Sequence, residues 1–151
     1  MCGFLGVIEL NKSFSKQDVL LAGTLMNKRG PDYSGYENIV IDNLNIQLLH
    51  KRLSIIDLSN SANQPFFDQK NEWVIIYNGE IYNYMEIKDE LKKNGIKFKS
   101  NSDTEVIIKS FEFWGEKSIN RFIGMFSFML INISSRKCYV VRDRTGVKPL
   151  Y

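Results

Sequence analysis

The hydrophobic positions along the chain fall into short runs that are typical of β-strands. We expect strands over residues 3–8, 39–41, 46–50, 73–77, 125–131 and 138–142. Asp42 and Asn43 are predicted to form the turn between the second and third runs, and residues 132–137 the turn that lets the last two runs pair. The run 125–131 is apolar at nearly every position, which indicates a strand covered on both faces.

Other segments carry apolar residues at helical spacing. We expect helices over residues 16–28 and 84–93, and a third helix that begins after Ser102. Ser15 with Asp18, and Ser102 with Glu105, have the spacing of capping boxes. A buried strand is expected to stop at Asn78-Gly79, and loops are expected over residues 29–32 and 57–70.

The composition favours one sheet-rich domain. The chain has 151 residues, of which 44% are hydrophobic, enough for a single core. It contains 17 Ile and 8 Val but only 2 Ala, and β-branched residues favour pleated sheets whereas Ala favours helices. Together with the order of the elements, this predicts a mixed α/β layered domain in which helices pack on antiparallel strands.

The charge and the scarce ligand residues exclude several classes of function. A net charge of +3 is too small to indicate a nucleic-acid or membrane surface, and no apolar run approaches the roughly 20 residues that cross a bilayer. Residues 1–10 lack the basic leader of a secretory signal, so we expect a cytoplasmic protein. Two cysteines and one histidine lack zinc-ligand spacing, and there is no glycine-rich phosphate loop. No metal or cofactor is therefore expected in this chain.

Cys2 is the first candidate for chemistry. Removal of Met1, expected before a small residue, would place a thiol and a free α-amine on the same residue. An α-amine with a pKa of roughly 7.7–8.0 suits a general base near neutral pH, and a nucleophile activated in this way needs no histidine. The alternative interpretation is a small residue inside a buried first strand.

Further positions fit acyl-transfer chemistry, each with a structural alternative. Asn78 and Gly79 would offer two donors to an oxyanion, or would form an ordinary hairpin turn. Arg52 would bind a carboxylate, or would be a solvated surface residue. Asp103, at a predicted helix start, has helix capping as its alternative. His50 is interpreted as a structural residue rather than a base, because the α-amine can serve instead.

Eight sequence blocks, in a fixed order, cover essentially the whole chain. They are Met-Cys-Gly-Phe-Leu-Gly (1–6), Arg-Gly-Pro-Asp (29–32), His-Lys-Arg-Leu-Ser-Ile (50–55), Gln-Pro-Phe (64–66), Tyr-Asn-Gly-Glu-Ile-Tyr-Asn (77–83), Ser-Asp-Thr-Glu (102–105), Gly-Met-Phe-Ser-Phe (124–128) and Arg-Asp-Arg-Thr-Gly-Val-Lys-Pro-Leu-Tyr (142–151). Together they resemble the glutaminase domain of the asparagine synthetase family, a class II glutamine amidotransferase domain of the N-terminal-nucleophile hydrolase type. The form around Arg52 resembles asparagine synthetases rather than the sugar-amidating or phosphoribosyl-amidating relatives.

The resemblance implies a fold and a reaction. The implied fold is of class α+β, a four-layer αββα sandwich. Cys2 would attack the side-chain amide of L-glutamine, its α-amine would carry the proton, and Asn78 and Gly79 would hold the oxyanion. Ammonia would leave, and water would resolve the γ-glutamyl thioester.

The resemblance also implies how glutamine is bound. Arg52 would bind the α-carboxylate, while Asp103 and Glu80 would bind the α-amino group. The backbone of four consecutive residues would complete the pocket: Leu53, Ser54, Ile55 and Ile56. The loop over residues 29–32 would be a lid, in which Gly30 allows movement.

The family's glutaminase domain continues beyond the block that ends at Tyr151. We therefore expect residues 1–151 to be an incomplete domain, cut short at its C-terminal end, without the synthetase domain that would bind ATP and Mg and amidate aspartate. The expected partners are L-glutamine and a synthetase domain or chain that receives ammonia, with no nucleic acid and no membrane; a homodimer is compatible with this. Two alternatives stay open: an inactive truncated fragment, or an amidotransferase subunit that serves another acceptor such as a sugar acid.

Overall fold

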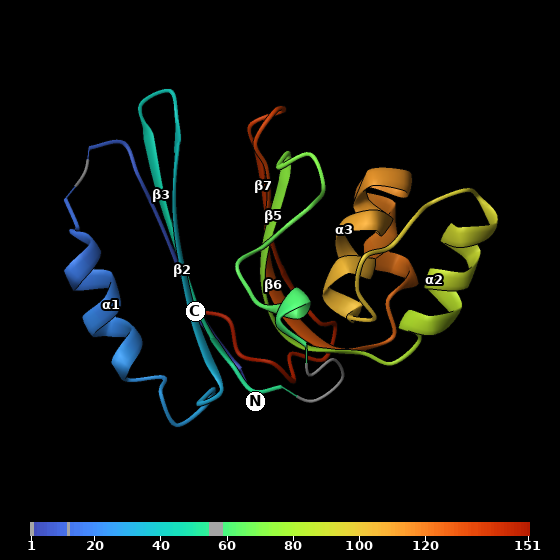
Figure 1. The fold of residues 1–151 in the computed structure, drawn as a ribbon, viewed down its shortest axis with the longest axis horizontal. Coiled ribbons are helices and arrows are strands. Elements are labelled where there is room, and N and C mark those ends of the chain that lie inside the picture. The colour runs from blue at the N-terminus through green and yellow to red at the C-terminus, as the bar shows by residue number, and fades with distance from the viewer. Residues whose placement is uncertain (1, 12, 55–58) are drawn as a thin grey trace.

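The computed structural model describes residues 2–11, 13–54 and 59–151, which form four stacked layers (Figure 1). In chain order the elements are β1 (Gly3–Glu9), α1 (Lys16–Thr24), β2 (Tyr33–Ile41), β3 (Leu44–Arg52), the 3-10 helix η1 (Asn60–Ala62), β4 (Phe66–Phe67), β5 (Trp73–Ile81), α2 (Tyr84–Lys93), α3 (Asp103–Trp114), the 3-10 helix η2 (Gly115–Arg121), β6 (Gly124–Asn132) and β7 (Lys137–Arg142). Two antiparallel sheets, in the orders β1-β3-β2 and β4-β5-β6-β7, face each other, with α1 outside the first and α2 and α3 outside the second. The αββα sandwich implied by the resemblance is confirmed.

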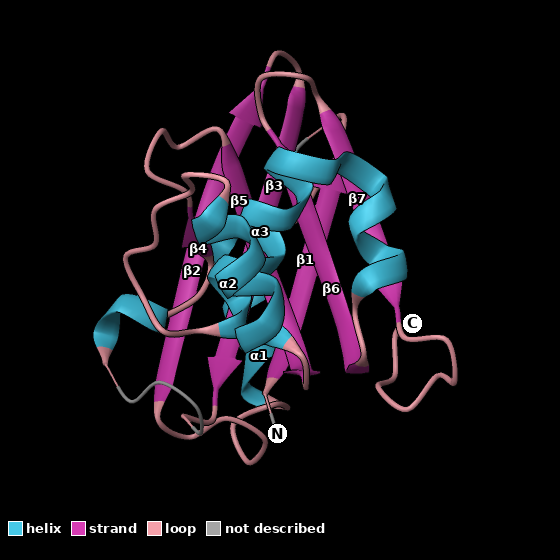
Figure 2. Cartoon of the chain, turned by 90° about the vertical axis from the view of Figure 1, so that its right-hand side faces the viewer, coloured by secondary structure: helices cyan, strands magenta, loops and turns pink. Residues whose placement is uncertain are grey.

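Figure 2 views the molecule from the side of α2 and α3, which lie in front of the second sheet. These helices contain 10 and 12 residues. Among the helices that the structure describes, none is both long and apolar enough to span a membrane.

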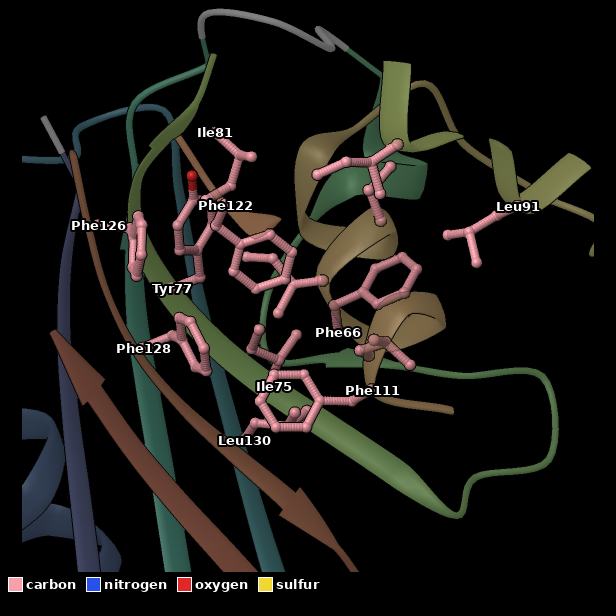
Figure 3. Close-up of a cluster of buried hydrophobic side chains, with 14 residues drawn as sticks. Phe66, Ile75, Tyr77, Ile81, Leu91, Phe111, Phe122, Phe126, Phe128 and Leu130 are labelled. Carbon is pink, nitrogen blue, oxygen red and sulfur yellow. The ribbon is translucent and has the colours of Figure 1, made fainter. Parts of the chain in front are cut away.

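Alternating side chains of β5 divide the apolar core into two clusters. Ile75 and Tyr77 belong to the larger cluster, which packs against α2 and α3 (Figure 3). Val74 and Ile76 belong to the smaller cluster, which joins the two sheets. Successive residues of a strand point to opposite faces, so β5 is buried on both sides. The neighbouring β6 is divided in the same way, which confirms that the run 125–131 is covered on both faces.

The strands follow the predicted apolar runs. The turn at Asp42-Asn43 is confirmed, with Asp42 at a φ of 52°. The helix predicted over 84–93 is α2, with the same bounds. In contrast, β2 begins at Tyr33 and β3 ends at Arg52, so both are longer than predicted. The pairing of β3 between β1 and β2 extends these strands beyond their apolar residues.

The first helix is shorter than predicted, because α1 ends at Thr24 rather than at residue 28. Beyond this point the chain continues in turns, with the Met26 N–H bonded to the Gly23 carbonyl at 3.0 Å. The side chain of Leu25 is exposed. No buried face therefore extends the helix through this segment.

The prediction that a strand stops at Asn78-Gly79 is wrong. β5 continues to Ile81, because β6 pairs with it through this dipeptide, with Asn78 opposite Ser127 and Gly79 opposite Phe126. The loop predicted over 57–70 is wrong in part, since η1 and β4 lie within it; residues 57 and 58 are outside the described residues.

One of the two predicted capping boxes is present. At the start of α1, the Asp18 N–H donates to Ser15 Oγ at 3.2 Å and the Ser15 N–H donates to Asp18 Oδ2 at 2.7 Å. At the start of α3, Ser102 Oγ accepts a hydrogen bond from the Thr104 N–H, but the carboxylate of Glu105 accepts from the backbone of the preceding loop, including the Ser100 N–H at 2.7 Å. The second capping box is therefore wrong, because closer donors in the loop occupy that carboxylate.

Candidate functional site

A pocket at one end of the sandwich gathers most of the residues that the sequence singles out. Its lining consists of Cys2, Arg52, Leu53, Ala62, Gln64, Tyr77, Asn78, Gly79, Glu80, Ser102, Asp103, Thr104, Met125 and Lys148. Seven of the predicted site residues are in this set: Cys2, Arg52, Leu53, Asn78, Gly79, Glu80 and Asp103. The described lining does not include Ser54, and Ile55 and Ile56 lie outside the described residues. Two sheets, the helix α3 and the 3-10 helix η1 thus contribute to a single site.

The pairing of β1 with β3 places Cys2 beside the end of β3. Gly3 lies opposite Lys51 in the register, so Cys2 lies next to the segment that follows. The Leu53 N–H donates to Cys2 Sγ at 3.3 Å, and Sγ lies 3.6 Å from the Leu53 carbonyl. Arg29 Nε donates to the Cys2 carbonyl at 3.2 Å. Leu53 therefore contacts the thiol and Arg29 contacts the backbone of Cys2, and together they hold the residue at the pocket wall.

Asn78 and Gly79 reach the pocket from the middle of β5 rather than from a turn. The Asn78 side chain points between the two sheets, on the same face as Ser127, whose buried hydroxyl has no partner among the described residues. A Cβ at Gly79 would lie only 2.3 Å from the Met125 carbonyl oxygen and 2.6 Å from Phe126 Cα. Only glycine fits this close approach of two backbones, so the hairpin alternative does not apply.

Arg52 is a buried residue of the pocket wall rather than a solvated surface residue. Its Nη1 donates to the Ser59 carbonyl at 2.9 Å and to Asn63 Oδ1 at 2.6 Å. These two acceptors come from the loop that follows β3. They fix the direction of the guanidinium at the pocket wall.

Asp103 is the first residue of α3, but its carboxylate does not cap the helix. Ser102 is the N-cap, while Asp103 Oδ2 accepts from the Tyr77 hydroxyl at 2.6 Å and from the Ile81 N–H at 3.1 Å. Burial raises the pKa of Asp103; hydrogen bonds from Tyr77 and from the backbone of Ile81 and Thr104 oppose this, and nearby Glu80 adds to it. The net effect is a raised pKa, at a position 4% exposed.

His50 lies in the interior, as expected of a structural residue. Its Nε2 is 2.9 Å from the Tyr77 carbonyl oxygen, and its Nδ1 has no partner among the described residues. Burial lowers the pKa of His50 to about 4, and the nearby charge of Arg52 acts in the same direction. The ring is therefore neutral at pH 7, and the described lining of the pocket does not include it.

Among the polar residues of the pocket that were given no chemical role from the sequence are Gln64, Tyr77 and Lys148. Gln64 Oε1 accepts from the Tyr77 N–H at 2.6 Å, and the backbone N–H of Lys148 donates to Asp143 Oδ2 at 2.9 Å. All three lie within the resemblance blocks, and this was the one sequence signal that could have found them.

The loop over residues 29–32 is bonded to the segment that follows β3. The Ser54 N–H donates to Asp32 Oδ2 at 2.7 Å, and the Asp32 N–H donates to the Arg52 carbonyl at 3.0 Å. A Cβ at Gly30 would lie 2.2 Å from the Lys51 carbonyl oxygen. Gly30 thus permits close packing on β3, and its role as the moving part of a lid stays a prediction.

Both cysteines are free thiols. Cys138 is exposed and is not among the described residues of the pocket lining. No group of three or more His, Cys, Asp or Glu side chains that could hold a metal ion occurs within residues 2–11, 13–54 and 59–151.

Comparisons with known proteins place the whole chain in a family. Residues 1–151 match the family model described as a glutamine amidotransferase domain. The chain is 36% identical to glutamine-hydrolyzing asparagine synthetase 1 of Bacillus subtilis (strain 168), with 100% of this chain and 24% of that protein covered. It is 37% identical to the glutamine-hydrolyzing asparagine synthetase of Zea mays, with 100% of this chain and 25% of that protein covered. The chain therefore spans about a quarter of the length of these curated relatives.

A solved structure shares the fold. The glutamine phosphoribosylpyrophosphate amidotransferase from B. subtilis, complexed with ADP and GMP, superposes with a TM-score of 0.78 at 18% identity. The match covers 99% of this chain and 38% of that one. At this identity the likeness shows the fold alone.

Proposed function

The chain belongs to the family of glutamine amidotransferase domains, and we propose that it hydrolyses L-glutamine to glutamate and ammonia through a thioester on Cys2. The observation that carries the proposal is the composition of the pocket. A thiol from the first sheet lies in one pocket with an Asn-Gly pair from the second sheet, an arginine and a buried carboxylate. These are the groups that acyl transfer from an amino-acid amide requires.

The reaction follows from the groups on Cys2. Once Met1 is removed, the α-amine takes the thiol proton, directly or through water, and the thiolate attacks the amide carbon of glutamine. The side-chain amide of Asn78 and the backbone N–H of Gly79 would donate to the oxygen that becomes negative. The α-ammonium then protonates the departing nitrogen, which leaves as ammonia. Water attacks the thioester, its proton returns to the α-amine, and glutamate and the free thiol result.

The charged residues of the pocket would orient the substrate. Arg52 would bind the α-carboxylate, and Asp103 with Glu80 would bind the α-ammonium, so that the amide faces Cys2. The backbone of Leu53 and Ser54, with that of Ile55 and Ile56 in the undescribed segment, would complete the cradle. Ser54 donates its N–H to Asp32, so it would act through the loop over 29–32.

The ammonia would pass to a synthetase domain or chain. The names of the relatives and the share of their length matched here support an asparagine synthetase, in which ATP and Mg would act in the synthetase part to amidate aspartate. We further propose a cytoplasmic location, no nucleic-acid or membrane partner, and a homodimer as a compatible assembly.

The test compares Cys2→Ala with Cys138→Ala. The parent chain should release glutamate from glutamine, lack Met1 by mass spectrometry, and be labelled at Cys2 by a diazoketone analogue of glutamine. Cys2→Ala should reduce glutamate release by at least about a thousandfold, because the nucleophile is gone. Cys138→Ala removes the exposed thiol and should leave the rate unchanged. Activity that persists in Cys2→Ala, or a parent that keeps Met1 and releases no glutamate, contradicts the proposal.

A further inference from the structure

Asp103 is a buried carboxylate whose position depends on β5. Its Oδ2 accepts a hydrogen bond from the Tyr77 hydroxyl at 2.6 Å and another from the Ile81 N–H at 3.1 Å. The second donor belongs to the backbone and is fixed by the strand. The first donor belongs to a side chain. The Tyr77 hydroxyl can therefore be removed by a substitution, whereas the Ile81 N–H cannot.

Tyr77 is held at three points, which fixes where its hydroxyl lies. Its N–H donates to Gln64 Oε1 at 2.6 Å, and its carbonyl oxygen lies 2.9 Å from His50 Nε2. Its ring packs in the larger core cluster beside Phe126 and Phe128, with the hydroxyl toward Ile81 (Figure 3). The residue is 3% exposed and still lines the pocket. A side chain so constrained can set the position of its partner.

The hydroxyl also affects the charge of Asp103. Burial raises the pKa of this carboxyl group, and the bond from Tyr77 lowers it by stabilising the charged form. Burial and the neighbouring carboxylates hold the pKa of Tyr77 well above its usual range, so the phenol remains a donor. Without the hydroxyl, the carboxylate would lose a donor and become easier to protonate.

We infer that Tyr77 is a positioning residue for the substrate: its hydroxyl holds the Asp103 carboxylate in the place that the α-ammonium of glutamine requires. The inference rests on the proposed function, because it assumes that Asp103 meets the α-ammonium. It adds a residue that need not touch the substrate. It also predicts a selective effect, confined to ligands that carry an α-amino group.

The experiment measures binding by calorimetry in a Cys2→Ala background, where no turnover occurs. The two ligands are glutamine and the monoamide of glutaric acid, which has the same amide and carboxylate but no α-amino group. Tyr77→Phe keeps the ring and removes only the hydroxyl. It should weaken glutamine binding by about tenfold and leave binding of the glutaric acid monoamide within about twofold. In the active chain, KM for glutamine should rise with little change in kcat.

The control and a second variant keep the outcomes distinct. Tyr139→Phe removes the hydroxyl of a half-buried tyrosine that packs against the same core cluster but is not among the described residues of the pocket lining, and should change neither affinity. Asp103→Asn should show the selectivity of Tyr77→Phe more strongly, and adding Tyr77→Phe to it should have little further effect. If Tyr77→Phe folds poorly by circular dichroism, Asp103→Asn alone decides: an equal loss for both ligands overturns the inference.

A loss in Tyr77→Phe that is equal for the two ligands, or no loss for either, also overturns it while the proposed function stands. If the chain with Cys2 intact neither binds nor hydrolyses glutamine, the proposed function fails first, and the inference fails with it.

Discussion

The imidazole of His50 is fully enclosed between the sheets, where its Nε2 meets the Tyr77 carbonyl and its Nδ1 has no partner among the described residues. A neutral ring with its proton on Nε2 donates to that carbonyl. A protonated ring would place an uncompensated positive charge in the interior, close to Arg52. The folded chain therefore resists protonation of its one histidine.

This gives a prediction for the pH dependence of stability. The pKa of His50 is about 4 in the folded chain against roughly 6.5 when unfolded, so the unfolded chain binds more protons between these values. The free energy of unfolding should fall as the pH falls from 6.5 toward 4, by about 2 kcal/mol from this group near pH 4.5. Urea titrations at pH 7 and pH 4.5 measure the loss.

His50→Gln isolates this contribution, because glutamine keeps a donor and does not titrate. The parent should lose about 2 kcal/mol more than His50→Gln between the two pH values. Asp103 and Asp143, whose pKa values are also displaced, titrate in both chains and cancel in the comparison. An equal loss in the two chains would mean that His50 is exposed or already charged in the folded state.

At the same scale, the sequence predicted the candidate reacting residues that the structure brings into one pocket, but not the residues that hold them. Cys2, Asn78 and Asp103 were predictable because their chemistry and the resemblance agree, and the structure brings them into one pocket. Tyr77 and Gln64 were not, because their roles depend on hydrogen bonds between residues 13 to 40 positions apart, such as Tyr77 to Gln64 and Gln64 to Thr104. Periodicity carries no information about such contacts.

Among the elements, β5 shows how a partner strand overrides a local preference. Asn-Gly is a strong turn signal, but β6 pairs with β5 on both sides of this dipeptide. Inside the strand, Gly79 is required for a different reason: it has no Cβ at a point where two backbones approach closely. Asn78 and Gly79 were therefore correctly predicted to lie at the candidate site, but the end of the strand that the dipeptide indicated was wrong.

Gly79→Ala tests this account of the strand. The new methyl group would meet the Met125 carbonyl oxygen and Phe126 Cα, both backbone atoms that a rotamer change cannot move. We expect a loss of about 2–4 kcal/mol in the free energy of unfolding and a fall in kcat, because β5 must shift at the oxyanion donors. Chemical denaturation and glutamate release measure the two effects.

Gly95→Ala is the matched control. Gly95 has a φ of 84° and no atom within 4 Å of an added Cβ. The substitution should cost about 1 kcal/mol through backbone strain and leave kcat unchanged. A Gly79→Ala variant that is no less stable than Gly95→Ala would show that the two strands can separate at little cost.

Short elements escaped the sequence analysis for a physical reason. β4 has two residues and η1 has three, too few to show a period. Strand ends such as Tyr33 and Arg52 lie beyond the apolar runs, where pairing with a neighbour decides the boundary. The long run 125–131, apolar at nearly every position, was predicted almost to the residue, because its pattern and its burial agree.

For the whole molecule, the decisive feature is that the site lies across two sheets. Cys2 and Arg52 come from the ends of β1 and β3, while Asn78 and Gly79 come from β5. The distance between the thiol and the proposed oxyanion donors is thus set by the packing of one sheet on the other. This packing rests on the smaller cluster, whose buried members are Ile41, Ile46, Leu48, Val74, Ile76 and Ile131. The sequence predicted every strand except β4, and the two pairs joined by short turns, but not how these pairs and the remaining strands are divided between the two sheets.

Two neighbouring isoleucines of β5 allow this dependence to be measured. Ile75 and Ile76 are both fully buried, but Ile75 faces α2 and α3 while Ile76 faces the first sheet. Either residue changed to Ala should cost about 3 kcal/mol and lower the melting temperature by roughly 6–12 °C. Each variant should still unfold in a single transition, because both sheets share the inter-sheet cluster.

The two variants should differ in kcat, although their losses of stability are expected to be similar. Ile76 lies two residues from Asn78 on the same face of β5, so a cavity there lets the sheets shift where the thiol meets the oxyanion donors. Measured well below the melting temperature, Ile76→Ala should lower kcat about tenfold or more, whereas Ile75→Ala should retain most of it. Equal kcat values would mean that the site is held by its own hydrogen bonds rather than by the sheets. Two separate transitions would mean that the sheets fold independently.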